Sequence, residues 1–225
     1  AHLVDLSAKV VETGADFGIS VDPDVDRLAL ICEDGKPFGE EYILVSVSDY
    51  VLQNVKGSSV SNLSSSRALR DVTEQYGGSY SAAAVGEGNV TTKMKECGAL
   101  IGGEGNGGVI YPALHYGRDA MVGVALFLTN LAYRKMKVSE LLATYPRYVI
   151  AKNKIELSDS ALIDRILDKV KEVYASEDIN LIDGVKISFE SRKEWIHLRR
   201  SNTEPIIRIY AEAASKEAAD ALAQQ

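Results

Sequence analysis

The sequence predicts an α/β protein with three consecutive parts: the tail of one α/β domain, a complete α/β domain with a mostly parallel sheet, and an α+β domain with an antiparallel sheet. Two patterns predict this class. Helical and extended segments alternate through the middle of the chain, as in a parallel sheet that is covered on both faces. Near the carboxyl end, extended segments follow one another between two helical segments, as in an antiparallel sheet.

Residues 1–38 are expected to be the end of a domain whose beginning lies outside the chain, because they are too few for an independent core. They hold a helical pattern and two short apolar strands, at 18–21 and 28–32, that flank a turn. One side of the helical pattern carries the apolar residues Leu3, Leu6, Val10 and Val11.

Residues 39–147 are predicted to be the complete α/β domain. Its helices are expected at 40–55, 66–76 and 89–97 and after residue 119, and its strands at 59–63, 80–85 and 99–101. The pattern changes near Pro146, which indicates a domain boundary. Residues 148–225 form the third part, with helices expected at 160–174 and from about 215, and strands at 185–189, 195–199 and 206–211.

The composition is that of ordinary globular protein. A chain of 225 residues, 46% of them hydrophobic, can bury a substantial core. The formal charge of −7 argues against a surface for nucleic acids or anionic membranes, so an anion has to be bound by a local basic pocket. Cys32 and Cys97 lack metal-ligand spacing and are expected to be buried free thiols. With no signal peptide and no apolar run long enough for a bilayer, a cytoplasmic protein is expected.

An acidic turn, Asp22-Pro23-Asp24-Val25-Asp26-Arg27, separates the first two predicted strands. Carboxylates at alternate positions repel one another unless a cation lies among them. Mg²⁺ binds oxygen ligands at about 2.0–2.1 Å and commonly completes its coordination with a phosphate oxygen. Asp22, Asp24, Asp26 and Glu33 also fit a calcium loop of the EF-hand type, but Arg27 stands where that loop needs glycine. The remaining alternative is a solvated acidic turn.

A glycine-rich loop follows at 101–109 and fits the pattern G-x-G-x-x-G. A dinucleotide site is rejected because the residues after Gly108 are extended, and because Glu104 would repel a pyrophosphate. A carboxylate and an amide suit a polyol better, since Glu104 accepts hydrogen bonds from hydroxyl groups while Asn106 can donate and accept. The alternative is a flexible surface turn.

A third loop, at 199–208, joins two predicted strands and is dense in hydrogen-bond donors. Arginine presents a planar fork to phosphate, and charge-assisted hydrogen bonds contribute about 1.5–3 kcal/mol each. A basic strand edge that prevents aggregation would explain the arginines but not the adjacent Ser-Asn-Thr cluster. His115 and Arg118 either reach the pocket of the glycine-rich loop or lie on the surface.

In this order, the three motifs resemble those of the α-D-phosphohexomutase family, which includes phosphoglucomutase, phosphomannomutase and phosphoglucosamine mutase. The resemblance covers essentially the whole chain. Residues 84–90 and 115–119 are similar to phosphoglucosamine mutases. The resemblance implies an enzyme that moves a phosphoryl group between the 6- and 1-positions of a hexose phosphate, closest to glucosamine phosphate, through a phosphoserine and a bisphosphorylated intermediate.

The resemblance also assigns residues. It places Mg²⁺ at Asp22, Asp24 and Asp26, and it places Arg27 beside the phosphoserine. Glu104 and Asn106 are assigned to the sugar hydroxyls. The non-reacting phosphate is assigned to Arg199, Ser201, Asn202 and Thr203.

The sequence departs from the family pattern in two ways. The serine loop Thr-Ala-Ser-His-Asn-Pro is not present in these residues. The chain is therefore expected to be inactive alone, to bind Mg²⁺ weakly or not at all, and to need amino-terminal domains of the same protein as partners. Gly108 stands where family members often have histidine, and Ala84 where they often have a basic residue, which leaves the general acid and base unassigned. Glucose or mannose phosphates, a non-catalytic sugar-phosphate-binding module and a calcium-binding regulator are the alternatives.

Overall fold

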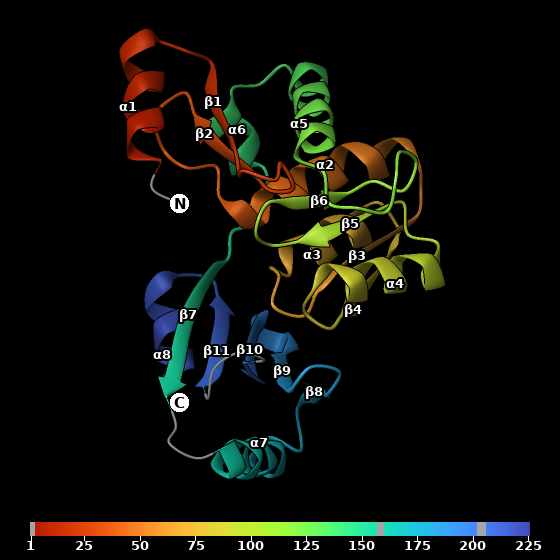
Figure 1. Cartoon of the computed structure of the whole chain (residues 1–225), viewed down its shortest axis with the longest axis vertical. Coiled ribbons are helices and arrows are strands. Elements are labelled where there is room, and N and C mark those ends of the chain that lie inside the picture. The colour runs from red at the N-terminus through yellow and green to blue at the C-terminus, as the bar shows by residue number, and fades with distance from the viewer. Residues whose placement is uncertain (1–2, 157–159, 202–205) are drawn as a thin grey trace. The chain divides into compact units, whose positions relative to one another are not determined.

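The structure is a computed structural model of the chain and describes residues 3–156, 160–201 and 206–225 (Figure 1). The chain divides into two compact units, residues 1–146 and residues 147–225. None of the helices in the described ranges is long and apolar enough to cross a membrane.

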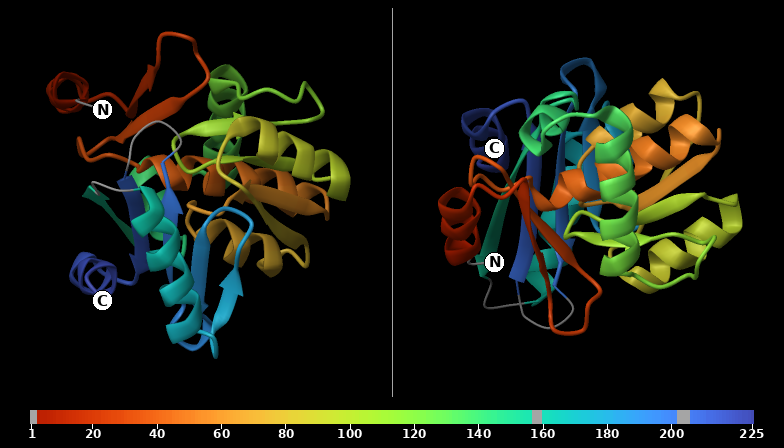
Figure 2. Two further views of the ribbon diagram at one scale, coloured as in Figure 1. Left: turned by 60° about the horizontal axis from the view of Figure 1, so that its bottom comes forward. Right: turned by 90° about the horizontal axis from the view of Figure 1, so that it is seen from above.

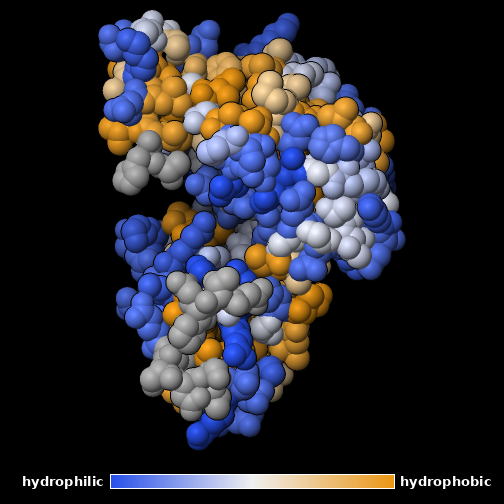
Figure 3. All heavy atoms as spheres, in the orientation of Figure 1, coloured by the Kyte–Doolittle hydropathy of each residue, from blue (hydrophilic) through white to orange (hydrophobic). Residues whose placement is uncertain are grey.

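The first unit begins with helix α1 (Val4–Thr13) and an antiparallel hairpin of β1 (Phe17–Val21) and β2 (Leu28–Cys32). The helix approaches the hairpin closely because Gly18 has no side chain: a Cβ there would lie 2.8 Å from Val10 Cγ2. Val10 is buried, whereas Val11 is 58% exposed. Val11 lies at the edge of the packed side of α1, because a Cβ on Gly35, in the turn after β2, would lie 2.8 Å from its Cγ2. Figure 3 shows hydrophobic surface over this part of the molecule.

In the described part of the first unit, a four-stranded sheet runs in the order β4 (Ser79–Ala83), β3 (Ser58–Asn62), β5 (Ile101–Glu104), β6 (Gly108–Ile110). β3 pairs in parallel with β4 and β5, and β6 pairs antiparallel with β5. The α/β class with a mostly parallel sheet is confirmed. The third strand lies at 101–104 rather than 99–101, because the Ala99 N–H still caps the preceding helix by donating to the Met94 carbonyl at 2.9 Å.

Helices of the first unit lie around this sheet: α2 (Glu40–Asn54), α3 (Ala68–Gln75), α4 (Glu87–Cys97), α5 (Ala120–Arg134) and α6 (Val138–Ala143). α4 packs on β3, β4 and β5, while α2 packs on β5 and on α5 (Figure 2). Buried Asp49 ties α2 to its neighbours, since it accepts hydrogen bonds from Tyr76 at 2.6 Å, Tyr145 at 2.9 Å and Arg134 at 2.8 Å. These bonds fix the helical layer that supports the sheet.

In the described part of the second unit, a five-stranded antiparallel sheet runs in the order β7 (Val149–Glu156), β11 (Ile206–Ala213), β10 (Glu194–Arg200), β9 (Val185–Phe189), β8 (Asp178–Asn180). A short 3-10 helix, η1 (Glu190–Arg192), connects β9 to β10. Helices α7 (Ser160–Val173) and α8 (Lys216–Ala223) place Ile163 and Leu222 in one apolar cluster with strand residues such as Ile187 and Ile207. The predicted antiparallel sheet is confirmed.

Candidate functional site

The acidic turn forms the tip of the β1–β2 hairpin, closed by the pairing of Val21 with Leu28. Oxygen atoms from the carboxylates of Asp22, Asp24 and Asp26 lie within 4.8 Å of one another. Asp22 organises the turn, because its Oδ1 accepts hydrogen bonds from the backbone N–H groups of Asp26 at 3.1 Å and Arg27 at 3.0 Å. The Asp22 carboxylate therefore holds the backbone of the turn in place.

The carboxylates of this acidic loop (residues 22–27) differ in their electrostatic surroundings. The backbone N–H of Arg27 and its Nε, which donates to Asp22 Oδ2 at 2.6 Å, hold the pKa of Asp22 well below its usual range. Burial raises the pKa of Asp26, and a side-chain hydrogen bond with Asp22 adds to the effect. The buried Oδ1 of Asp26 accepts no hydrogen bond from the described residues, although Arg27 Nε lies 3.5 Å away. An orphaned oxygen beside two more carboxylates is a donor set that fits a hard divalent cation.

Glu104 ends β5 and is only 5% exposed. Its Oε1 accepts hydrogen bonds from Asn62 Nδ2 at 2.8 Å and from the Gly86 N–H at 3.2 Å. Its Oε2 accepts one from Arg118 Nη1 at 2.9 Å. Because its partners come from three separate segments, the Glu104 carboxylate is held in one orientation, with lone pairs left for further donors.

The rest of the glycine loop (residues 103–108) turns back toward the hairpin. Asn106 Oδ1 accepts a hydrogen bond from the Gly108 N–H at 3.1 Å, which closes the loop on itself. Gly107 adopts a φ of 88°, in the left-handed region, and its carbonyl accepts from the Leu28 N–H at 3.0 Å. The glycine loop is thereby bonded to the strand that follows the acidic loop.

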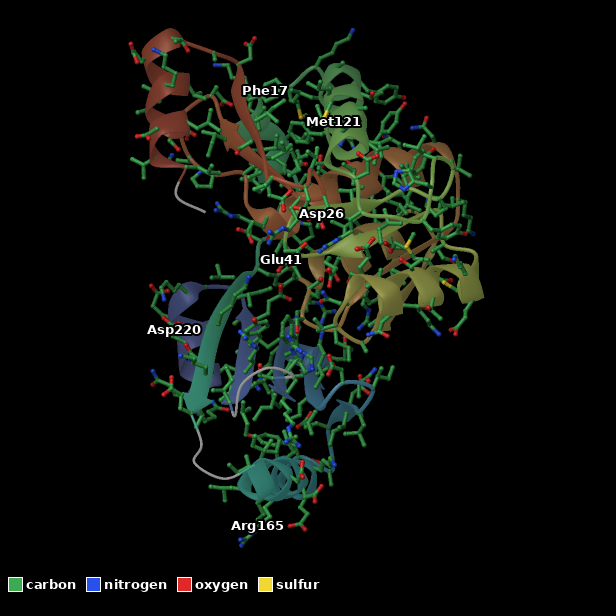
Figure 4. All side chains as sticks on the ribbon, in the orientation of Figure 1. Phe17, Asp26, Glu41, Met121, Arg165 and Asp220 are labelled. Carbon is green, nitrogen blue, oxygen red and sulfur yellow. The ribbon has the colours of Figure 1, made fainter. Side chains whose placement is uncertain are left out.

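The acidic loop and the glycine loop meet at one cavity of about 320 Å³. Asp22 and Arg27 line it from the acidic loop, Asn106 lines it from the glycine loop, and Glu40 lines it from the start of α2. Figure 4 labels Asp26 at the tip of the hairpin and Glu41 in the first turn of α2. Two motifs that are far apart in the sequence therefore face a common space.

Several residues of this site were missed or left open by the sequence. Arg118 is not a free surface residue, because its side chain is 18% exposed and contacts Asp26, Glu87 and Glu104. Asn62 has a detectable signal, since it is a polar residue at the carboxyl end of a parallel strand, where ligand sites of α/β sheets lie. His115 Nε2 instead forms a hydrogen bond of 3.0 Å with Oδ2 of Asp119, at the start of α5.

The predicted phosphate-binding residues belong to the second unit. Arg199 lies in β10, with its Nη1 3.9 Å from Asp183 Oδ2. Ser201 follows β10, and its N–H donates to the Ile206 carbonyl at 3.0 Å, which joins the strand ends. Asn202 and Thr203 lie outside the described residues.

Two family models match this chain. The one described as phosphoglucomutase/phosphomannomutase, alpha/beta/alpha domain III, matches residues 39–148. The one described as phosphoglucomutase/phosphomannomutase, C-terminal domain, matches residues 153–225. The chain belongs to the phosphoglucomutase/phosphomannomutase family. The resemblance inferred from the three motifs is confirmed.

The named relatives include both a phosphoglucosamine mutase and a phosphoglucomutase/phosphomannomutase. A probable phosphoglucosamine mutase of Methanopyrus kandleri is 33% identical over 222 residues, which make up 97% of this chain and 48% of that protein. A phosphoglucomutase/phosphomannomutase of Thermococcus kodakarensis is 35% identical over 209 residues, 92% of this chain and 45% of that protein. The chain thus spans about half the length of the curated relatives it matches.

Solved structures share the fold. The crystal structure of a phosphoglucomutase/phosphomannomutase family protein from Burkholderia thailandensis superposes with a TM-score of 0.83 at 25% identity, covering 99% of this chain and 48% of that one. N-acetylphosphoglucosamine mutase of Aspergillus fumigatus, crystallised with GlcNAc-6P and magnesium, gives a TM-score of 0.67 at 17% identity, covering 92% of this chain and 50% of that one.

Proposed function

We propose that the chain is the carboxyl-terminal half of a Mg²⁺-dependent phosphohexomutase that acts on glucosamine phosphate. The observation that carries the proposal is the meeting of the two loops: Asp22 and Asn106 line one cavity, and Arg118 contacts both Asp26 and Glu104. The proposed reaction moves the phosphoryl group from a serine to one sugar oxygen, and then from the other sugar oxygen back to that serine.

In this proposal Asp22, Asp24 and Asp26 hold Mg²⁺. The buried Oδ1 of Asp26, which accepts no hydrogen bond from the described residues, supports the assignment. When bound, Mg²⁺ neutralises charge on the phosphoryl group that is transferred. Arg27 holds Asp22 in place through its Nε and its backbone N–H. The same arginine is proposed to lie beside the phosphoserine, where its remaining guanidinium donors can bind phosphate oxygens.

Glu104 and Asn106 are proposed to bind the sugar hydroxyls. Glu104 suits this role because Asn62, Gly86 and Arg118 orient its carboxylate before any ligand arrives. A preoriented acceptor loses little freedom on binding, so it positions the reacting oxygen at low entropic cost.

Arg199, Ser201, Asn202 and Thr203 are proposed to hold the phosphate that does not react. The register of the sheet supports an anion here, because Arg199 lies directly opposite Arg208 on the neighbouring strand. Two guanidinium groups at paired positions can both donate to the oxygens of a phosphate monoester.

The preference for glucosamine phosphate is supported by the names of relatives such as the Methanopyrus kandleri protein. The carboxylates around the cavity also suit an amino sugar, whose ammonium group is cationic. Comparing glucosamine, glucose and mannose phosphates as substrates, in a protein that contains this chain together with a phosphoserine loop, tests the preference. A higher kcat/KM for glucose or mannose phosphate would assign the chain to the other branch.

The metal role is tested in the same protein with Asp24→Asn. We expect this change to lower the Mg²⁺-dependent kcat roughly 10²-fold or more, as for other losses of a group that stabilises transition-state charge. Asp34→Asn is the matched control, since Asp34 lies in the next turn and pairs with Lys36 at 2.8 Å. Retention of normal Mg²⁺-dependent activity by the Asp24 variant would contradict the proposed metal site.

A further inference from the structure

Arg118 lies between carboxylates from three different elements. Its Nη2 contacts Asp26 Oδ2 of the acidic loop. Its Nη1 donates to Glu104 Oε2 at 2.9 Å, at the end of β5. Its Nε lies 3.3 Å from Glu87 Oε2, at the start of α4. One guanidinium therefore joins a predicted cation ligand to a predicted sugar ligand.

The backbone and its neighbours fix the path of the Arg118 side chain. The Arg118 N–H donates to Glu87 Oε1 at 3.0 Å. Arg118 also forms an isolated antiparallel β-bridge with Ile110, the last residue of β6. The stem passes over Gly108, where an added Cβ would lie 2.5 Å from Arg118 Cδ. The absence of a side chain at Gly108 is what lets the guanidinium reach both loops.

We propose that Arg118 is a positioning residue that holds Asp26 and Glu104 in one geometry, so that cation binding at the acidic loop is transmitted to the sugar-binding carboxylate. The inference rests on the proposed function of the two loops. Arginine suits this task because its planar fork presents donors in fixed directions to two different carboxylates, whereas lysine is a point charge. Without it, Asp26 and Glu104 would repel each other and lose their common partner.

Gly86 provides a reporter of the Glu104 carboxylate. Its N–H donates to Glu104 Oε1 at 3.2 Å, and it lies just before α4, away from the acidic loop in the sequence. The chemical shift of the Gly86 amide therefore follows the carboxylate that Arg118 is proposed to position. Amides of Asp24 and Val25 report on the acidic loop itself.

The test is an NMR titration of the ¹⁵N-labelled 225-residue chain with Mg²⁺ alone. In the wild-type chain we expect the amides of Asp24, Val25 and Gly86 to shift with the same midpoint. In Arg118→Met, Asp24 and Val25 still respond but Gly86 loses most of its shift, and Arg118→Lys restores only part of it. Gly108→Ala, which displaces the stem and keeps the charge, gives the same loss as Arg118→Met.

Arg70→Met is the matched control, because Arg70 pairs with Glu74 at 2.9 Å on α3 and lies outside this cluster. It keeps the wild-type Gly86 response. Unchanged amide shifts in residues 46–54 of α2 and in α6 (Val138–Ala143) show that each variant remains folded. These residues belong to the same unit as Arg118.

The outcomes separate the inference from the function on which it rests. If the acidic-loop amides respond to Mg²⁺ but Gly86 does not, or if Gly86 responds normally in both Arg118→Met and Gly108→Ala, the inference is overturned and the cation site stands. If the acidic loop itself does not respond, the chain does not bind Mg²⁺ without a phosphoserine loop, and the metal role is decided by the Asp24→Asn test. The positioning role then requires that Arg118→Met, unlike Arg70→Met, shifts both the Asp26 and the Gly86 amides in the metal-free spectrum.

Discussion

Gly107 lies in crowded surroundings, whereas Gly88 has open space where a side chain would be. Gly107 adopts a φ of 88°, and a Cβ there would lie 2.1 Å from the Leu28 carbonyl oxygen. Backbone cannot yield as a flexible side chain can, so the glycine loop depends on this position. At Gly88, in the first turn of α4, an added Cβ meets nothing within 4 Å.

We therefore predict that Gly107→Ala destabilises the first unit by about 1–3 kcal/mol, through the strained φ and the overpacking. Gly88→Ala should instead stabilise it by about 0.4–1 kcal/mol, because the unfolded chain loses conformational freedom. Urea denaturation of the two variants provides the measurement. Equal effects of both substitutions would contradict the account of the loop.

At the scale of elements, the contact between α2, α3 and α5 makes stability depend on pH. Burial, and then the hydrogen bond to Asp49, raises the pKa of Tyr76 to about 12. An unfolded tyrosine has a pKa of about 10. The stability contributed by this group is thus fully present below pH 10 and is lost as the pH rises from about 10 to 12, because the unfolded chain releases its proton first.

We predict that the melting temperature of the wild-type chain falls more steeply between pH 10 and 12 than that of Tyr76→Phe, which has no proton to release at this position. Thermal melts in matched buffers of constant ionic strength measure the difference. The two proteins are compared relative to their own values at pH 7, since the variant also lacks the hydrogen bond to Asp49. Parallel pH profiles would rule out this role for Tyr76.

Elements with a clear apolar period were predictable, and those without it were missed. The helix expected at 160–174 is α7, at Ser160–Val173, and the strand expected at 185–189 is β9. β7 (Val149–Glu156) was missed because most of its side chains are exposed and several are charged, so it lacks an apolar alternation. α6 (Val138–Ala143) was missed because six residues do not complete a helical pattern.

At the scale of the whole molecule, the chain's single tryptophan reports on one unit. Trp195 is buried in β10, and its Nε1 donates to Glu212 Oε1 at 2.6 Å. Its indole ring also lies under Lys186 Nζ, 4.0 Å from the ring centroid. These partners all belong to residues 147–225, so tryptophan fluorescence follows the second unit.

We predict that a fragment of residues 147–225 folds alone, because the apolar cluster of its sheet and helices comes from its own residues. Its urea unfolding, followed by Trp195 fluorescence, should have an m-value below that of the whole chain followed by circular dichroism, since m scales with the surface exposed. A fragment without a cooperative transition would show that the second unit needs the first.

The sequence by itself determined the family, the acidic loop, the carboxylate of the glycine loop and the order of the three motifs, because each of these is a local pattern of residue types. The tertiary structure alone decided what joins them. The contacts of Arg118 with Asp26 and Glu104, and the space over Gly108 through which it passes, come from strands and loops that are distant in the chain. Such contacts depend on how the elements pack, and the spacing of residues along a sequence does not specify that packing.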